Sequence, residues 1–394
     1  MNHVASLTMT QIFRVDQIGS LLRPQALKGA YARHGNGDIG DSELARIQDD
    51  SVKELIAKQE AHGVSILTDG EYRRLNFQDS FVESVAGFVP KKQTMQFQES
   101  RTVGGEALQR WVPDSGKTDP AMQYWRPIAE RLRLADNVPL KEWQSASALT
   151  KKPVKVTLIA TDRICENFQR QNAAGVYTSA EQYRADVIAI EREIVKQLAE
   201  AGCPYIQHDA PAYTAYVDAK SLERMRGLGI DPMQQMTQSI DADNSVIDGV
   251  NNACGAKGVT FGIHLCRGNV RSMWHREGGY DAIAEKLFNS LHHDRLLLEY
   301  DTERAGTFAP LRFVPKDKIV VLGMVSSKVP QLESAEELKR RIEEASRYLP
   351  LEQLALSPQC GFSSNIVGNL LGEDDQWRKL ELIQQVALDV WAVE

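Results

Sequence analysis

The sequence lacks the long apolar runs that membrane and secreted proteins carry. No stretch approaches the roughly 20 consecutive apolar residues that a membrane helix needs. The N-terminal residues do not form a basic start followed by an apolar segment, as a secretory signal would. We therefore expect no membrane partner and a cytoplasmic location.

Basic residues are in short supply, and phosphate-binding loops are missing. Lysine and arginine number 46 against 53 aspartates and glutamates, which gives a net charge of -7 and no basic stripe for a nucleic acid. Neither the Walker spacing nor a GxGxxG pattern after a strand is present, which argues against nucleotide hydrolysis and a dinucleotide cofactor. We expect small molecules as partners and no nucleic acid.

Cysteine is scarce. The five cysteines are an odd number in a chain of 394 residues, which favours reduced thiols over a disulfide framework. Most of them are expected to be small buried residues. At 42% hydrophobic residues, the chain nevertheless has enough apolar material for a sizeable core.

Short apolar runs alternate with amphipathic stretches along the whole chain, which is typical of repeated βα units. Helical spacing is clear between Val187 and Leu198 and between Leu338 and Leu349. The pattern predicts an α/β fold, a (β/α)8 or TIM barrel, whose active site gathers at the C-terminal ends of the strands. The eight expected strands are 13–18, 64–68, 154–159, 204–207, 259–263, 295–299, 319–323 and 353–356.

The polar segment 81–152 interrupts this alternation. It predicts an insertion after the second strand, with a hairpin in 94–113 and helical stretches around 122–134. Long insertions in barrel enzymes are often lids or binding loops, so this one could cap the barrel mouth. No repeat or linker divides the chain, and we expect one decorated barrel domain over 1–394.

Metal-binding residue types stand at the ends of three expected strands. His264 and Cys266 close the fifth run, Glu299 closes the sixth, and Cys360 follows the eighth. Each alone is more often a packed or salt-bridged residue than a ligand, but barrel strand ends converge on one face. Zinc takes thiolate, imidazole and carboxylate ligands. We therefore predict a zinc site, rich in negative charge and better suited to activating a thiol than water.

Further polar residues follow other strands. Glu71 and Asp209 could hold a substrate ammonium group, and Ser20 follows a glycine that lets the backbone approach an anion. Helix capping, a loop salt bridge or a plain turn explains each of these positions equally well. Other candidates with an equally ordinary structural explanation are Arg73, Arg74 and Arg267 for an acidic substrate tail, and His208 for acid–base chemistry.

The types of these residues and their order along the chain resemble those in the catalytic C-terminal barrel of the cobalamin-independent methionine synthase family. The resemblance is closer to the single-barrel relatives in that family. The likeness runs nearly end to end. It implies Zn²⁺ bound by His264, Cys266, Glu299 and Cys360. It also implies that Ser20, Glu71 and Asp209 hold the amino-acid end of homocysteine. The matching segments are Ile18-Gly19-Ser20, Asp69-Gly70-Glu71, Ile206-Gln207 with Asp209, His264-x-Cys266, Glu299, and Pro358-x-Cys360-Gly361.

The resemblance implies transfer of a methyl group to homocysteine to give methionine, with the donor left open. Folate-using members have a tryptophan after the third strand and a histidine after the seventh. This chain has Thr161-Asp162-Arg163 and Ser326-Ser327-Lys328 there. A folate, a corrinoid or corrinoid protein, or another alkyl donor is therefore considered. The alternatives are alkylation of another thiol, such as coenzyme M by an epoxide, a non-catalytic zinc-stabilised barrel, and a zinc-free relative of the uroporphyrinogen decarboxylase.

Overall fold

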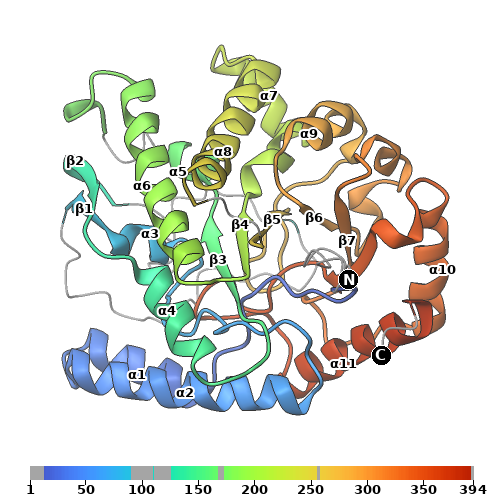
Figure 1. Cartoon of the computed structure of the whole chain (residues 1–394), viewed down its shortest axis with the longest axis horizontal. Coiled ribbons are helices and arrows are strands. Elements are labelled where there is room, and N and C mark those ends of the chain that lie inside the picture. Colours follow the sequence, from blue (N-terminus) through green and yellow to red (C-terminus); the bar gives the residue numbers. More distant parts are fainter. Residues whose placement is uncertain (1–12, 90–109, 111–125, 167–172, 255–257, 392–394) are drawn as a thin grey trace, which may run out of the picture.

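Six parallel strands, hydrogen-bonded in the order β3-β4-β5-β6-β7-β8, form the centre of the protein (Figure 1). The computed structural model describes residues 13–89, 110, 126–166, 173–254 and 258–391. Every residue of the six strands is buried, as expected for a parallel sheet covered on both faces. The strands are β3 (Lys155–Ile159), β4 (Tyr205–Asp209), β5 (Thr260–Leu265), β6 (Arg295–Glu299), β7 (Ile319–Val325) and β8 (Leu354–Pro358).

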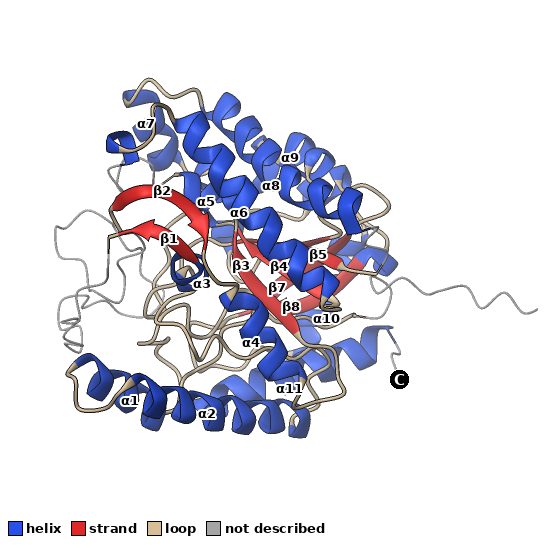
Figure 2. Cartoon of the chain, turned by 60° about the vertical axis from the view of Figure 1, so that its left-hand side comes forward, coloured by secondary structure: helices blue, strands red, loops and turns tan. Residues whose placement is uncertain are grey.

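Helices cover the outside of these strands (Figures 1 and 2). The two expected helical patterns lie in α6 and α10, which begin after Ser179 and Ser334; both serines accept a hydrogen bond from a backbone N–H of the first turn. Within the described ranges, no helix combines the length and apolarity needed to cross a membrane. The α-helices are α1 (Gln25–Gly35), α2 (Asp41–Ala61), α3 (Asp79–Ser84), α4 (Val138–Ser147), α5 (Thr161–Cys165), α6 (Ala180–Glu200), α7 (Ala219–Gly227), α8 (Pro232–Cys254), α9 (Ala284–Ser290), α10 (Ala335–Ser346) and α11 (Glu373–Trp391). The 3₁₀ helices are η3 (Ala173–Gly175), η4 (Pro211–Tyr216), η5 (Tyr280–Ala282), η6 (Glu303–Ala305), η7 (Ala309–Phe313) and η8 (Leu351–Gln353).

The first two expected strands occupy strand positions without forming strands. Val15 makes a single parallel bridge to Leu356 of β8, and Leu67 makes one to Val154 beside β3. These bridges extend the row of six strands on both sides and complete the eight positions of the barrel. The expectation of regular strands at 13–18 and 64–68 was therefore wrong, although the barrel itself is confirmed.

Side chains replace the missing backbone ladder between these two segments. Gln17 Nε2 donates to Ile66 O at 2.6 Å, and Thr68 Oγ1 donates to Gly19 O at 2.7 Å. Deeper in the barrel, the Asp16 carboxylate lies 2.6 Å from Lys155 Nζ and 3.2 Å from Arg295 Nε. These three charged side chains are fully buried, and their pairing fixes the first segment against β3 and β6.

The segment between the second and third strand positions contains a small antiparallel sheet of its own, seen beside α3 and α6 in Figure 2. Its strands are β1 (Val85–Phe88) and β2 (Ile128–Leu134). The helix expected around 122–134 is wrong for 128–134, because Ile128 and Leu132 are buried through strand pairing with β1 and packing in a core that includes α6. Most of the hairpin expected at 94–113 lies outside the described residues.

Arg110 is the described residue of that stretch, and it lies against the loop after β5. Its guanidinium pairs with Asp218 at 2.6 Å and with Glu277 at 2.7 Å, and it stacks over the Trp274 ring at 5.4 Å. The role of 81–152 as an inserted lid and the single-domain organisation of 1–394 stay predictions.

Candidate metal centre

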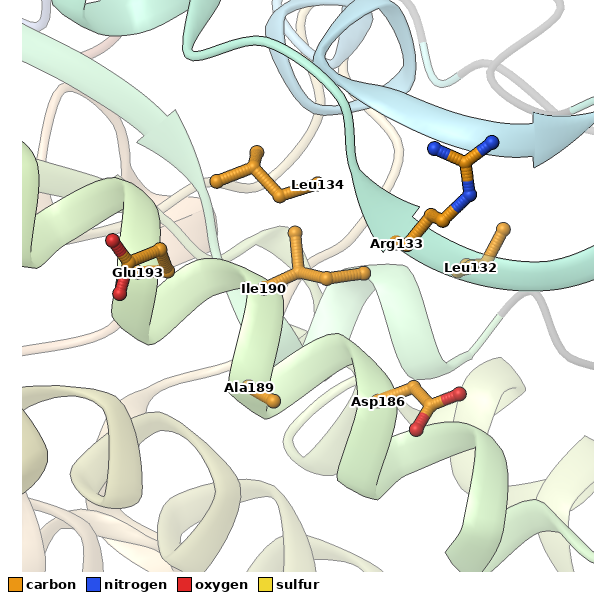
Figure 3. A pocket seen from close by; sticks show the side chains of 7 residues that line it. All are labelled: Leu132, Arg133, Leu134, Asp186, Ala189, Ile190 and Glu193. Carbon is orange, nitrogen blue, oxygen red and sulfur yellow. The ribbon is translucent and has the colours of Figure 1, made fainter.

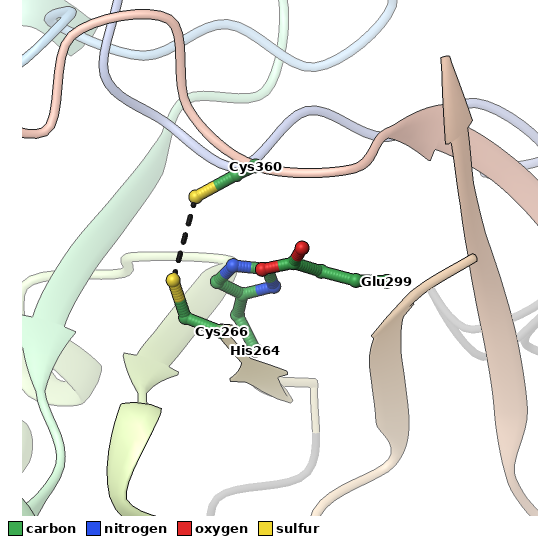
Figure 4. Close-up of side chains that lie close together, drawn as sticks. All are labelled: His264, Cys266, Glu299 and Cys360. Atoms are coloured by element: carbon green, nitrogen blue, oxygen red, sulfur yellow. Dashed lines mark hydrogen bonds between the residues drawn. The ribbon is translucent and has the colours of Figure 1, made fainter. Parts of the chain in front are cut away.

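Four predicted ligand residues converge at the C-terminal ends of β5, β6 and β8. One ligand atom from each of His264, Cys266, Glu299 and Cys360 lies within 4.8 Å of the others. The sulfur atoms of Cys266 and Cys360 are 3.6 Å apart, as the dashed line in Figure 4 marks. Alternation along a strand explains the pairing of His264 with Cys266, since residues two apart point to the same face.

The donor set and its spacing fit zinc. Two sulfurs bound at about 2.3 Å in tetrahedral geometry would lie about 3.8 Å apart, close to the observed separation. His264 Nδ1 lies 3.3 Å from Leu297 O, and its Nε2 is buried with no hydrogen-bond partner in the part of the chain that the structure describes. A buried nitrogen of this kind needs a partner, and a metal ion would supply one.

The pKa values of the two thiols are shifted in opposite directions. The hydrogen bond from Cys360 holds the pKa of Cys266 well below its usual range, against the opposing effect of burial. Gly268 N also donates to Cys266 Sγ at 3.3 Å. The same thiol pair raises the pKa of Cys360, with burial acting in the same direction. The lowered pKa favours the thiolate form of Cys266, which is the form that binds a cation.

Glu299 is oriented by donors on both of its oxygens. Arg267 N donates to Oε1 at 2.5 Å, and Arg304 Nη2 lies 3.0 Å from Oε2. Burial, followed by the Cys266 thiolate, raises the pKa of Glu299 to about 7. A divalent cation at this position would favour the charged carboxylate.

Two further buried carboxylates lie near the cluster. Thr157 Oγ1 donates to Glu71 Oε1 at 2.9 Å, whereas Glu71 Oε2 is buried with no hydrogen-bond partner among the described residues. Asp209 is level with His264 across the β4–β5 pairing, and Gln207 Nε2 donates to its Oδ1 at 2.8 Å. Burial raises the pKa of Asp209 to about 7, and the charges of His264 and Glu71 also act on it.

Ser20 lies beside Gly361, the residue that follows Cys360. A Cβ built on Gly361 would come within 2.0 Å of Ser20 Oγ, so this close approach requires a glycine. Phe362 N donates to Ser20 O at 2.9 Å. The first segment of the barrel is thereby joined to the loop that carries Cys360.

The other candidates do not join the cluster. Arg73 pairs with Asp49 at 2.7 Å, and Arg74 forms a buried pair with Glu142. The Arg267 guanidinium stacks over the Tyr280 ring at 4.5 Å. His208 is buried on the outer face of β4, where its Nδ1 lies 2.9 Å from His293 Nε2. Burial lowers the pKa of His208 to about 4.

A shallow pocket of about 240 Å³ lies elsewhere, between β2 and α6 (Figure 3). None of the predicted site residues lines it. Its lining residues are Leu132, Arg133, Leu134, Asp186, Ala189, Ile190 and Glu193.

Comparison with known proteins agrees with this arrangement. The protein-family model for the catalytic domain of the cobalamin-independent synthase matches residues 126–369, a range that includes all four cluster residues. The chain is 35% identical over 389 residues to the uncharacterized protein YxjH of Bacillus subtilis (strain 168), covering 96% of this chain and 95% of that protein. It is 24% identical over 346 residues to a methionine synthase of Sulfurisphaera tokodaii, covering 87% and 84% of the two chains. A B12-independent methionine synthase from Shewanella sp. W3-18-1, solved in complex with selenomethionine, has the same fold, with a TM-score of 0.67, 17% identity and coverage of 97% and 98%.

Fold and site together define a parallel α/β barrel with a cluster able to hold a metal ion at the C-terminal ends of its strands. The chain belongs to the cobalamin-independent methionine synthase family, whose members are methyltransferases acting on small molecules.

Proposed function

We propose that the protein is a zinc-dependent methyltransferase that methylates the sulfur of homocysteine to give methionine. The observation that carries the proposal is the meeting of two thiols, an imidazole and a carboxylate beside a second pair of buried carboxylates. The first group is a zinc ligand set, and the second is suited to an ammonium group.

The cluster residues would hold zinc, and the other residues would hold the substrate. Zinc, when bound, would lower the pKa of the substrate thiol, so that a thiolate is present near neutral pH. Glu71 Oε2, which has no protein donor among the described residues, would accept a hydrogen bond from the substrate ammonium, and Asp209 would supply a second negative charge. Thr157 fixes Glu71 through the bond to its other oxygen. Ser20, which lies beside Gly361, would bind the carboxylate end.

The reaction balances without a redox partner. The sulfur electron pair forms the new bond to the methyl carbon while the bond from that carbon to the donor breaks, and the donor keeps the bonding electrons. The thiol proton is released before attack, and the product is a neutral thioether. Fixing the amino-acid end would orient the sulfur for in-line attack, which is the contribution of positioning to the rate.

Charge favours an amino-acid thiol over the alternatives. A sulfonate such as that of coenzyme M would meet repulsion from Glu71 and Asp209, both of which are buried. A purely structural zinc would be closed off, whereas Cys266 is partly exposed. These observations support catalysis with homocysteine as acceptor.

The donor is to be found by experiment. In the segments after the third and seventh strands, where folate-using members have a tryptophan and a histidine, the Asp162 carboxylate accepts a hydrogen bond from Ser239 and Lys328 is buried among oxygen acceptors. The donors to compare are methyltetrahydrofolate, a methyl-corrinoid or corrinoid protein, and an epoxide. We place the reaction in the cytoplasm, where thiols stay reduced.

The test is a screen of thiols and donors with zinc-loaded protein, read as the mass of the alkylated product. We expect methionine from homocysteine, and loss of both zinc and product in Cys266→Ser and Cys360→Ser. Cys203→Ser is the matched control, because Cys203 is a buried cysteine outside the cluster. Zinc-loaded protein that alkylates no thiol with any donor would refute the proposed function.

A further inference from the structure

One buried side chain bridges the loop that carries Cys266 and the loop that carries Cys360. Asn269 Nδ2 donates to Gly361 O at 2.6 Å and to Ser364 Oγ at 3.1 Å. Its Oδ1 accepts from Lys328 Nζ at 2.8 Å and from Asn369 Nδ2 at 2.9 Å. Asn269 thus makes all four hydrogen bonds that a side-chain amide can make. It stands three residues after Cys266, and one of its bonds goes to Gly361, the residue next to Cys360.

Lys328 determines which way this amide points. It directly follows Ser327 in the loop after β7, it is fully buried, and its Nζ also donates to Gly268 O at 3.0 Å and Met273 O at 3.2 Å. An ammonium group has donors only, so the Asn269 oxygen must face Lys328 and the NH₂ group must face Gly361. The lysine therefore selects the one orientation in which Asn269 reaches the Cys360 loop.

Neighbouring residues complete the connection. Ser327 Oγ donates to Gly361 O at 2.9 Å, and Asn369 Nδ2 donates to Ser327 O at 2.8 Å. Ser272 N donates to Asn369 Oδ1 at 2.9 Å. The loops after β5, β7 and β8 are thereby joined by one buried network, and a fully satisfied network of this kind is rigid.

We propose that Asn269, oriented by Lys328, is the positioning residue that sets the separation between Cys266 and Cys360. This role of Asn269 rests on the proposed zinc function, because Cys266 and Cys360 lie on loops from distant strands and both sulfurs must bind one ion. In the structure the two sulfurs lie 3.6 Å apart.

The test uses metal-free protein and the reaction of the two thiols with diamide. Diamide takes up the two electrons and two protons that leave the thiols as the S–S bond forms, and peptide mass spectrometry measures the Cys266–Cys360 crosslink. Asn269→Asp places an oxygen opposite Gly361 O, and Lys328→Met removes the ammonium. We expect each variant to form the crosslink at least about tenfold more slowly than wild type, because small misplacements have large kinetic effects.

Lys318→Met is the matched control. Lys318 is a buried lysine at the opposite end of β7, where its Nζ donates to His293 O at 2.7 Å. We expect this variant to lose stability and to keep the wild-type crosslinking rate. Asn369→Ala is a milder variant, which removes one donor to Asn269 and should give an intermediate rate if the stronger variants do not fold.

A second readout is zinc affinity, measured by chelator competition. Loss of a residue that orients metal ligands typically costs about 10- to 100-fold in affinity, and we expect a loss in this range for Asn269→Asp and Lys328→Met. Folded variants that crosslink at the wild-type rate, or an equal slowing in Lys318→Met, would overturn the proposal. If the wild-type protein methylates no thiol, the proposed function is refuted. The positioning role of Asn269 would then still be decided by the rate of crosslinking with diamide.

Discussion

Glu142 makes the shortest ion-pair contacts of Arg74 and leaves only a longer contact between Arg74 and Glu71, so Glu142→Gln should both destabilise the fold and weaken recognition of the substrate amine. Arg74 Nη2 lies 2.7 Å from Glu142 Oε2, and its Nε lies 3.2 and 3.1 Å from the two carboxylate oxygens. Arg74 Nη1 is 3.8 Å from Glu71 Oε1. In Glu142→Gln, Glu71 becomes the nearest carboxylate for the freed guanidinium.

The magnitude follows from these contacts. Removing one partner of a buried ion pair costs about 3–5 kcal/mol. Glutamine keeps an acceptor oxygen, and Thr157 still accepts two hydrogen bonds from Arg74, so we expect about 3 kcal/mol. A pairing between Arg74 and Glu71 would remove a charge-assisted bond to the substrate ammonium, worth about 1.5–3 kcal/mol, which corresponds to roughly 10- to 100-fold in kcat/KM.

The assay compares two thiols and one control. Urea unfolding and kcat/KM for homocysteine and for mercaptopropionate, which lacks the amine, are measured above pH 7, since burial raises the pKa of Glu142 to about 6. Glu191→Gln is the control, because Glu191 is equally buried and burial raises the pKa of its carboxyl group well above the usual range. An equal fall in kcat/KM for both thiols in Glu142→Gln would refute its effect on amine recognition. A loss of folding stability no larger than that in Glu191→Gln would refute the contribution of the ion pair between Glu142 and Arg74.

Three further predictions concern the carboxylates and the metal. Glu71→Gln should raise KM for homocysteine at least about tenfold and leave mercaptopropionate nearly unchanged, and equal effects in steady-state kinetics would reject the ammonium role. The folded-state pKa of Asp209, raised by burial to about 7, predicts that stability without substrate falls as pH rises from about 4 to about 7, while homocysteine affinity increases over the same window. Urea midpoints and calorimetric titration should show both trends, and Asp209→Asn should reduce the slope of both; a profile unchanged in that variant would contradict the assignment. Chelator treatment should abolish methyl transfer and leave circular dichroism native, because the cluster residues lie outside the apolar core groups, and unfolding on zinc removal would contradict this.

The barrel could be predicted from the sequence because its strands are short, apolar and regularly spaced. The expected runs 154–159 and 295–299 correspond to β3 and β6 almost residue for residue. The segments 13–18 and 64–68 have the same apolar character. However, side-chain hydrogen bonds such as that of Gln17 join them, and apolar periodicity does not predict such contacts. Segment 128–134 forms a strand by pairing with β1. Because β1 lies about forty residues earlier in the chain, the local sequence pattern does not reveal this pairing.

The four cluster residues were predictable for a similar reason. Their chemical types are rare, and each stands at a strand end, so the fold alone brings them together. Asn269 and Lys328 carry no such signal, since asparagine and lysine are common in loops and their value depends on contacts with residues about 60 to 100 positions away. Glu142 likewise gains its meaning only from the buried guanidinium of Arg74.

The most direct test of the central claim is zinc K-edge X-ray absorption of the zinc-loaded protein, recorded with and without homocysteine. We expect two sulfur neighbours from Cys266 and Cys360 in the free protein, and a third sulfur when homocysteine is added. A sulfur count that stays at two with saturating homocysteine, or a zinc environment without the two cysteine sulfurs, would contradict it.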